Sequence, residues 1–212
     1  RDNIFKTNGK VEEKKCYFLG IYKTRVMKAI QNLDKYPFDS LTMSQIEIKK
    51  GTQLSEEVLN LINKQRKKEW NDSKPLKNYS EDKFFLLYDK ENIVAFAFLK
   101  DITINYLNRN YNILGLSNLI AIKKRKGFGE KLIKYIKKYA KRKTILGFTE
   151  KHNKRFYERC GLNLNKPLLL RFIYNKKIYE GEDLVIYLDG KDNFVKTVIL
   201  TKEKVILNTP FW

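Results

Sequence analysis

A basic segment with two glycines, placed between an apolar run and an amphipathic stretch, constrains the fold of this chain most. Residues 119–122 are apolar, and the run Lys124-Arg-Lys-Gly-Phe-Gly129 follows them. After Gly129, apolar residues recur at the spacing of one helical face: Leu132, Ile133, Ile136, Tyr139 and Ala140. The order therefore predicts a strand, a tight turn and a helix with one buried face.

This turn is suited to binding an anion. A helix N-terminus presents unpaired backbone N–H groups and a partial positive charge, which attract phosphate. Gly127 and Gly129 lack a Cβ atom, so the backbone can approach a ligand closely there, and Lys124, Arg125 and Lys126 add full charges. The turn lacks the Gly-Lys-Ser/Thr ending of a P-loop and the third glycine of a dinucleotide fingerprint. A plain connection between strand and helix is the alternative interpretation.

The turn and a second motif downstream resemble the two signatures of the GCN5-related N-acetyltransferases, the GNAT superfamily. Lys124-Arg-Lys-Gly-Phe-Gly129 is similar to the Arg/Gln-x-x-Gly-x-Gly/Ala turn, and Asn153-Lys-Arg-Phe-Tyr-Glu-Arg-Cys-Gly-Leu162 is similar to Asn-x-x-Phe-Tyr-x-x-x-Gly-Phe. Lys124 and Leu162 depart from these patterns mildly, because the turn binds phosphate through backbone amides and the last position is apolar. The resemblance covers about residues 43–175. It implies acyl transfer from acetyl-coenzyme A (acetyl-CoA) to an amine.

The resemblance also implies roles for individual residues. Tyr157 is expected to protonate the departing thiolate, with packing beside Phe156 as its alternative role. Asn153 is expected to contact the pantetheine or the phosphates, and the backbone before the turn is expected to pair with the pantetheine and orient the carbonyl. The expected coenzyme-binding residues are Leu119, Ile120, Ala121, Lys124, Arg125, Lys126, Gly127, Phe128, Gly129, Glu130 and Asn153.

The general base is not evident from the sequence. Glu150 and His152 lie just before the second motif, near where acceptors enter folds of this kind. Histidine is a common general base near neutral pH, whereas a lone histidine in a loop is more often simply exposed. An ordered water with a distant carboxylate is the third option, and it would leave no local signature.

The other segments predict a mixed α+β fold, with a twisted sheet flanked by helices in GNAT-like order. Ser55 is the expected N-cap of a helix that ends near Trp70, because Glu56 and Glu57 follow it in the first turn. Strands are expected at residues 46–48, 84–88, 93–99 and 144–148, and in a segment that ends at 122. Strands come first and a helix–strand–helix unit later, which favours the α+β class.

Three parts of the chain are expected. Residues 1–42 form an N-terminal extension with a candidate helix at 22–30, residues 43–175 form the acetyltransferase domain, and residues 176–212 form a C-terminal β extension. In the last part, residues 183–188 and 194–200 are expected to pair as a hairpin, because Asp189-Gly190 between them favours a turn.

The chain is strongly basic, with a formal net charge of +20. Such a charge can attract nucleic acid, anionic membranes or acidic proteins. Lysine outnumbers arginine, and asparagine and isoleucine are abundant, as an AT-rich genome would encode. A nucleic-acid partner is therefore considered but not favoured. The basic face expected on the helix after the turn consists of Lys134, Lys137, Lys138, Lys141 and Arg142.

The remaining observations limit the function classes. Two cysteines and one histidine make neither a disulfide framework nor a zinc site, so no metal is expected. No apolar run is long enough to span a bilayer, and the location is expected to be cytoplasmic. The expected function is acetyl-CoA-dependent N-acetyl transfer to a primary amine of a small molecule or protein. The alternatives are an RNA- or ribosome-associated acetyltransferase, and a non-catalytic module of the same fold that binds nucleic acid or protein.

Overall fold

The structure is a computed structural model, and it describes residues 45–70, 74–76, 81–178 and 183–208. Every described residue belongs to one compact unit, within residues 43–212. The candidate helix at residues 22–30 therefore lies outside the described residues, as does the rest of the expected N-terminal extension.

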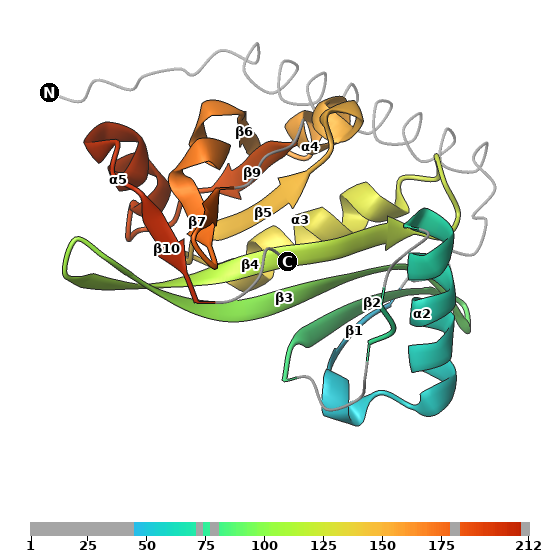
Figure 1. Cartoon of the computed structure of the whole chain (residues 1–212). Helices are drawn as coiled ribbons and strands as arrows, with labels where there is room; N and C mark the ends of the chain where they lie inside the picture. Colours follow the sequence, from blue (N-terminus) through green and yellow to red (C-terminus); the bar gives the residue numbers. More distant parts are fainter. Residues whose placement is uncertain (1–44, 71–73, 77–80, 179–182, 209–212) are drawn as a thin grey trace, which may run out of the picture. The chain divides into compact units, whose positions relative to one another are not determined.

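A seven-stranded sheet with the order β1-β2-β3-β4-β5-β9-β6 forms the centre of this unit (Figure 1). Its neighbouring strands are antiparallel, except that β4 and β5 run parallel. The strands are β1 (Ile46–Lys50), β2 (Lys83–Asp89), β3 (Asn92–Tyr106), β4 (Arg109–Ala121), β5 (Ile145–Thr149), β6 (Asn163–Asn165) and β9 (Leu184–Leu188). A small second sheet contains β10 (Val205–Leu207), β7 (Phe172–Tyr174) and β8 (Lys177–Ile178), in that order.

Helices connect and cover these strands. The α-helices are α2 (Glu56–Glu69), α3 (Phe128–Ala140), α4 (Lys154–Arg159) and α5 (Phe194–Thr201), and the short 3-10 helices are η1 (Gly51–Gln53), η2 (Lys151–Asn153) and η3 (Pro167–Arg171). Ser55 caps α2 as predicted, because its side chain accepts a hydrogen bond from the Val58 N–H at 3.4 Å. The α+β class and the mixed sheet flanked by helices are confirmed.

Helices α3 and α4 cover one face of the large sheet. Leu132, Ile133 and Ile136 of α3 are buried there against strand residues such as Ala97 and Leu114. The helical face predicted from apolar spacing is therefore confirmed. The predicted basic face is wrong at one position, since Lys137 is partly buried and its Nζ donates to the Cys160 carbonyl at 2.8 Å.

The opposite face of the sheet is covered in two places. Ile62 of α2 packs against Phe96 at one end, and Val198 of α5 packs in a cluster with Ile102 and Ile113 at the other. Figure 1 shows α2 and α5 at opposite ends of the long β3–β4 hairpin. Since side chains alternate along a strand, β3 and β4 contribute to the cores on both faces.

The hairpin predicted for residues 183–188 and 194–200 is wrong. The first segment is β9, which lies between β5 and β6 in the large sheet, and the second segment is part of α5. Asp189 accepts hydrogen bonds from the backbone N–H groups of Val195 at 3.1 Å and Lys196 at 2.9 Å, which satisfies the N-terminus of α5. After α5, residues 205–207 form the short strand β10 of the small sheet. The expected division of the chain near residue 175 stays a prediction.

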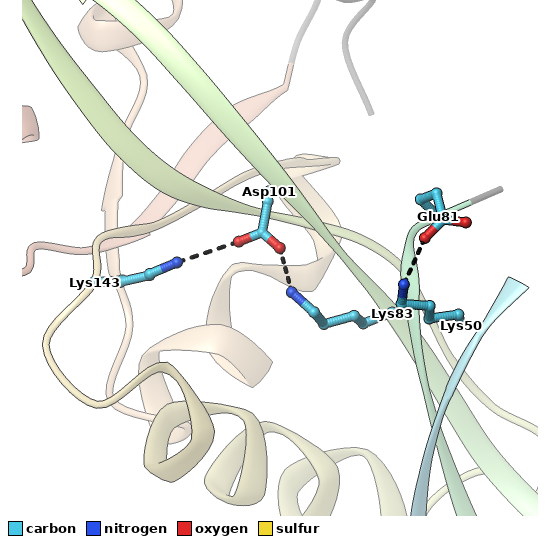
Figure 2. Close-up of polar contacts among 5 residues, drawn as sticks. All are labelled: Lys50, Glu81, Lys83, Asp101 and Lys143. Atoms are coloured by element: carbon cyan, nitrogen blue, oxygen red, sulfur yellow. Dashed lines mark hydrogen bonds and ion pairs between the residues drawn. The ribbon is translucent and has the colours of Figure 1, made fainter.

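Ion pairs connect the strands and the loop after α3 at the surface (Figure 2). Asp101 of β3 forms ion pairs with Lys83 of β2 and with Lys143, whose Nζ lies 3.3 Å from Asp101 Oδ1. Nearby, Lys50 Nζ lies 2.8 Å from Glu81 Oε2. Of these pairs, Asp101–Lys143 joins the loop between α3 and β5 to the sheet. Along the described part of the chain, no helix is long and apolar enough to cross a membrane.

Candidate active site

The middle of β4 pairs with the beginning of β5, and the two strands then separate. Residues 114–116 pair with residues 145–147, and β4 continues to Ala121 and β5 to Thr149 without further pairing between them. Among the described residues, the edge of β4 that faces β5 therefore has no strand partner from Ser117 onward. Backbone N–H and C=O groups on such an edge need partners, and an extended ligand can supply them.

A bulge lies at the start of this open edge. The register of β4 against β3 shifts so that Asn118 and Leu119 together lie opposite Ala97. Asn118 has φ 50°, in the left-handed region that asparagine tolerates better than most residues. A bulge bends the strand and redirects its backbone groups, and bulges occur often beside active sites.

The basic turn leads directly into α3. Gly127 is the N-cap residue with φ 75°, a backbone conformation that glycine adopts without strain. A Cβ atom on Gly129 would lie 3.2 Å from Phe156 Cζ, so glycine permits the close packing of α3 against α4. The first N–H groups of α3 have no acceptor within the helix, so they and the helix dipole are available to an anion. Anion binding at this turn stays a prediction.

A cleft of about 1610 Å³ extends along the open edge of β4. The walls of the cleft come from the end of α2, residues 116–119 and 121 of β4, the basic turn, the end of β5, and α4. Phe148 and Phe156 give it apolar surface, whereas the turn gives it positive charge. The cleft therefore offers a positively charged end and an apolar interior to one elongated ligand.

The structure brings together in this cleft all of the predicted site residues except Ile120. Those that line it are Leu119, Ala121, Lys124, Arg125, Lys126, Gly127, Phe128, Gly129, Glu130, Asn153 and Tyr157. Ile120 is 2% exposed and packs in the same cluster as Ile62 of α2 and Phe96, on the other face of the sheet. Its side chain is therefore not part of the cleft, because residues alternate along β4. The binding roles of these residues stay predictions.

Tyr157 packs against Phe156 and also lines the cleft. Its ring lies 4.9 Å from that of Phe156, centroid to centroid, and the residue is 8% exposed where it lines the cleft. Burial raises the pKa of Tyr157 to about 12, although a hydrogen bond with the Thr149 side chain acts in the opposite direction. Thr149 Oγ1 also accepts a hydrogen bond from Asn153 Nδ2 at 3.3 Å. The Tyr157 hydroxyl is therefore protonated at neutral pH and able to donate a proton.

The cations of the turn differ in their surroundings. Lys124 Nζ lies 2.5 Å from Glu69 Oε1, which joins the turn to the end of α2. Arg125 and Lys126 are exposed, and no carboxylate of the described residues forms an ion pair with either of them. These two side chains are the cations most available to a phosphate group.

The two candidate bases lie together at the cleft wall. His152 Nδ1 is 3.1 Å from Glu150 Oε2, and the two side chains are 70% and 57% exposed, respectively. Both residues line the cleft. Their role as a general base stays a prediction. Within the described ranges, no group of three His, Cys, Asp or Glu side chains could hold a metal ion.

Sequence reasoning missed the contribution of α2 to this site. Arg66 and Trp70 line the cleft, and Arg66 Nε donates a hydrogen bond to Asn118 Oδ1 at 2.8 Å. An asparagine within the mostly apolar residues 113–121 was the available signal, since asparagine is depleted in strands. Its partner lies 52 positions away in the sequence, so periodicity could not identify it.

Comparison with known proteins assigns the family. A sequence model of the acetyltransferase (GNAT) family matches residues 55–162, from the N-cap of α2 to the end of the second motif. The chain belongs to this family. A search of curated proteins found no significant match.

Solved structures of similar proteins include three from different organisms. Escherichia coli ElaA is 12% identical, with 69% of this chain and 100% of that chain covered and a TM-score of 0.49. Bacillus subtilis N-acetyltransferase YlbP in complex with coenzyme A is 17% identical, with coverages of 69% and 97% and a TM-score of 0.47. Arabidopsis thaliana NAA60 in complex with acetyl-CoA is 13% identical, with coverages of 68% and 98% and a TM-score of 0.49. Identities this low do not establish the acceptor of this chain.

Proposed function

We propose that this chain is an N-acetyltransferase that transfers the acetyl group of acetyl-CoA to a primary amine of a small molecule or a protein. The observation that carries the proposal is the convergence of three features on one cleft. These are the N-terminus of α3 with its adjacent cations, the open edge of β4, and the hydroxyl of Tyr157. Membership of the GNAT family supports it.

Each feature suits one part of the donor substrate. The amides of the turn, with Arg125 and Lys126, suit the pyrophosphate. The pantetheine arm contains amide groups, which can pair with the edge of β4 as a neighbouring strand would. The Tyr157 hydroxyl suits the sulfur end, where negative charge develops.

The reaction follows from these positions. A neutral amine attacks the thioester carbonyl and forms the C–N bond, while backbone N–H donors stabilise the oxyanion. The C–S bond then breaks, and the departing thiolate takes the proton of Tyr157. The amine gives up one proton to a base or to water, and a proton from that base or from solvent restores the Tyr157 hydroxyl, so amine and thioester become amide and thiol with charge and protons balanced.

The anion site can be tested at Gly127. Asparagine and aspartate have the same shape and both tolerate a positive φ, so they differ at this position in charge alone. Against the parent, Gly127→Asp should weaken acetyl-CoA binding by roughly tenfold or more, because its carboxylate repels the pyrophosphate. Gly127→Asn should weaken it much less. Isothermal titration calorimetry measures both, and equal affinities for the two variants would place the phosphates elsewhere.

The acceptor can be found by measuring thiol release from acetyl-CoA with panels of small amines, peptide N-termini and aminoacyl-tRNA. The proposal expects an amine-dependent rate that Gly127→Asp lowers at subsaturating acetyl-CoA. Binding of acetyl-CoA without amine-dependent thiol release from any of these panels would favour the non-catalytic module instead.

A further inference from the structure

A side chain of α2 holds the bulge of β4 in place. Arg66 Nε donates to Asn118 Oδ1 at 2.8 Å, and Arg66 Nη1 donates to the Lys74 carbonyl at 2.6 Å. Asn118 Nδ2 also contacts the hydroxyl of Ser117. Arg66 therefore connects three segments: α2, the chain beyond it, and β4.

The segment beyond α2 is fixed by a second contact of the same kind. Asn63 Nδ2 donates to the Leu76 carbonyl at 3.1 Å, and the Leu76 N–H donates to Asn63 Oδ1 at 2.7 Å. Asn63 and Arg66 lie on one side of α2, because they are three residues apart. The Asn63 contacts thus fix Leu76, two residues after Lys74. Arg66 in turn donates hydrogen bonds through both Nε and Nη1.

The residue that Arg66 contacts is the strained residue of the bulge. Asn118 has φ 50°, and a non-glycine residue keeps such a conformation when the surrounding structure holds it there. The bulge lies where β4 loses its β5 partner, and Leu116, Ser117 and Asn118 line the cleft. A change in the Asn118 backbone would therefore alter the direction of the unpaired groups on the open edge.

We propose that Arg66 is a positioning residue, which holds the Asn118 bulge so that backbone N–H groups of residues 117–119 point at the acetyl carbonyl of the donor. This proposal rests on the proposed function. Arg66 does not itself touch the reacting atoms in this proposal. Its effect comes from preorganised donors, which stabilise the developing oxyanion because they need no rearrangement during the reaction.

The test compares two ligands that differ in the acetyl group alone, acetyl-CoA and coenzyme A. Isothermal titration calorimetry gives the ratio of their dissociation constants without any knowledge of the acceptor. The parent should prefer acetyl-CoA. Arg66→Met should reduce this preference by roughly 2- to 10-fold, the range of a single hydrogen bond, and leave the affinity for coenzyme A unchanged.

Four further variants separate positioning from simple structural support. Arg66→Lys keeps the charge but cannot make both hydrogen bonds, so its preference should be intermediate. Asn118→Gly keeps the positive φ accessible and removes the Oδ1 acceptor, so it should reproduce Arg66→Met. The double variant should lose no more than either single variant, because both remove the same contact. Lys67→Met alters an exposed neighbour on α2 and should retain the parental ratio.

The outcomes are distinct. An unchanged ratio in Arg66→Met and Asn118→Gly, or a parent without a preference for acetyl-CoA, overturns the proposal. An equal loss of affinity for both ligands also overturns it, since that is the result of a structural role. If Arg66→Met does not fold, as judged by its thermal transition, Asn118→Gly decides. If the parent binds neither ligand, the proposed function fails and this proposal fails with it.

Discussion

The Tyr157 hydroxyl combines two properties that a proton donor to a thiolate needs. Its proton is present at neutral pH, because an ordinary tyrosine has a pKa near 10 and burial raises the pKa of Tyr157 to about 12, and the residue still lines the cleft. In the proposed reaction, the hydrogen bond with Thr149 would stabilise the phenolate formed when Tyr157 gives up its proton. Thr149 Oγ1 also accepts a hydrogen bond from Asn153, so the second motif contains both the proposed donor and part of its support.

Tyr157→Phe tests the acid role with little change in packing, because it removes the hydroxyl alone. We expect turnover to fall by roughly 100-fold, the low end for a positioned acid, with the affinity for acetyl-CoA unchanged. Thiol-release kinetics and calorimetry measure the two quantities. Tyr135→Phe is the matched control, because Tyr135 is 37% exposed on α3 and does not line the cleft. An unchanged rate in Tyr157→Phe, with chemistry limiting, would exclude Tyr157 as the acid.

At the scale of secondary-structure elements, the end of α4 contacts Lys137, a residue that the sequence predicts on the exposed face of α3. Lys137 Nζ donates to the carbonyls of Cys160 at 2.8 Å and Gly161 at 3.1 Å, directly after α4 ends. A cation at a helix C-terminus satisfies free carbonyls and interacts favourably with the helix dipole. Since α4 carries Tyr157, Lys137 also supports the site.

Lys137→Met should lower the free energy of unfolding by about 1–2 kcal/mol, because two charge-assisted hydrogen bonds are lost. Lys138→Met, the adjacent exposed position, should change it by less than about 0.5 kcal/mol. Urea denaturation with an unchanged m-value provides the comparison. Equal effects of the two substitutions would show that the Lys137 contacts do not contribute.

The α5 segment shows where sequence patterns were insufficient. Residues 194–200 are rich in β-branched and aromatic side chains, which favour strands. In the structure, Asp189 satisfies the first N–H groups of α5, while Phe194, Val195 and Val198 bury one helical face. Cap geometry and tertiary burial therefore outweigh local propensity, and neither can be read from a seven-residue window.

The site was more predictable than the C-terminal segments for a physical reason. The turn, the start of α3 and the second motif are local, so residue order and spacing determine them. The contacts of Arg66 with Asn118 and of Lys137 with Gly161 join distant segments, and the sequence contains no periodic signal for such pairs. The bulge was equally hidden, since it depends on the register between β3 and β4.

The ion pairs of Asp101 give the loop after α3 a pH-dependent attachment. Partial burial raises the pKa of Asp101, but its hydrogen bonds and charge interactions with Lys83 and Lys143 lower it more, so the pKa is below its usual value. A carboxyl group whose pKa is lower in the folded state stabilises the protein above its unfolded pKa of about 3.9. That contribution is lost as the pH falls through the folded value.

Asp101→Asn should therefore destabilise the protein at pH 7 and have a smaller effect below about pH 4. The side chain is 51% exposed, so solvent screening limits the effect at pH 7 to about 1 kcal/mol or less. Thermal unfolding of the parent and the variant across this pH range gives the difference. A difference that does not depend on pH would show that the ion pairs are not its source.

At the scale of the whole molecule, the net charge of +20 exceeds what the proposed site requires. Of the cations at the turn, Arg125 and Lys126 are exposed in the cleft and Lys124 is paired with Glu69. Other lysines lie on the solvent side of α3, including Lys134 and Lys138. An amphipathic helix in a lysine-rich chain shows such a face to water without any partner, because its apolar face must be buried.

An electrophoretic mobility-shift titration with tRNA decides whether this charge serves a nucleic-acid partner. We expect weak, non-saturating association that falls steeply with salt, because phosphate contacts release counterions. Lys134→Glu combined with Lys138→Glu should change it little, since a diffuse charge has no essential position. Lys137 is left intact because its substitution would disturb α4 as well as the charge. Tight, saturable binding at near-physiological salt that the double variant abolishes would instead identify α3 as an RNA-binding face, and it would make the RNA-linked acetyltransferase the better assignment.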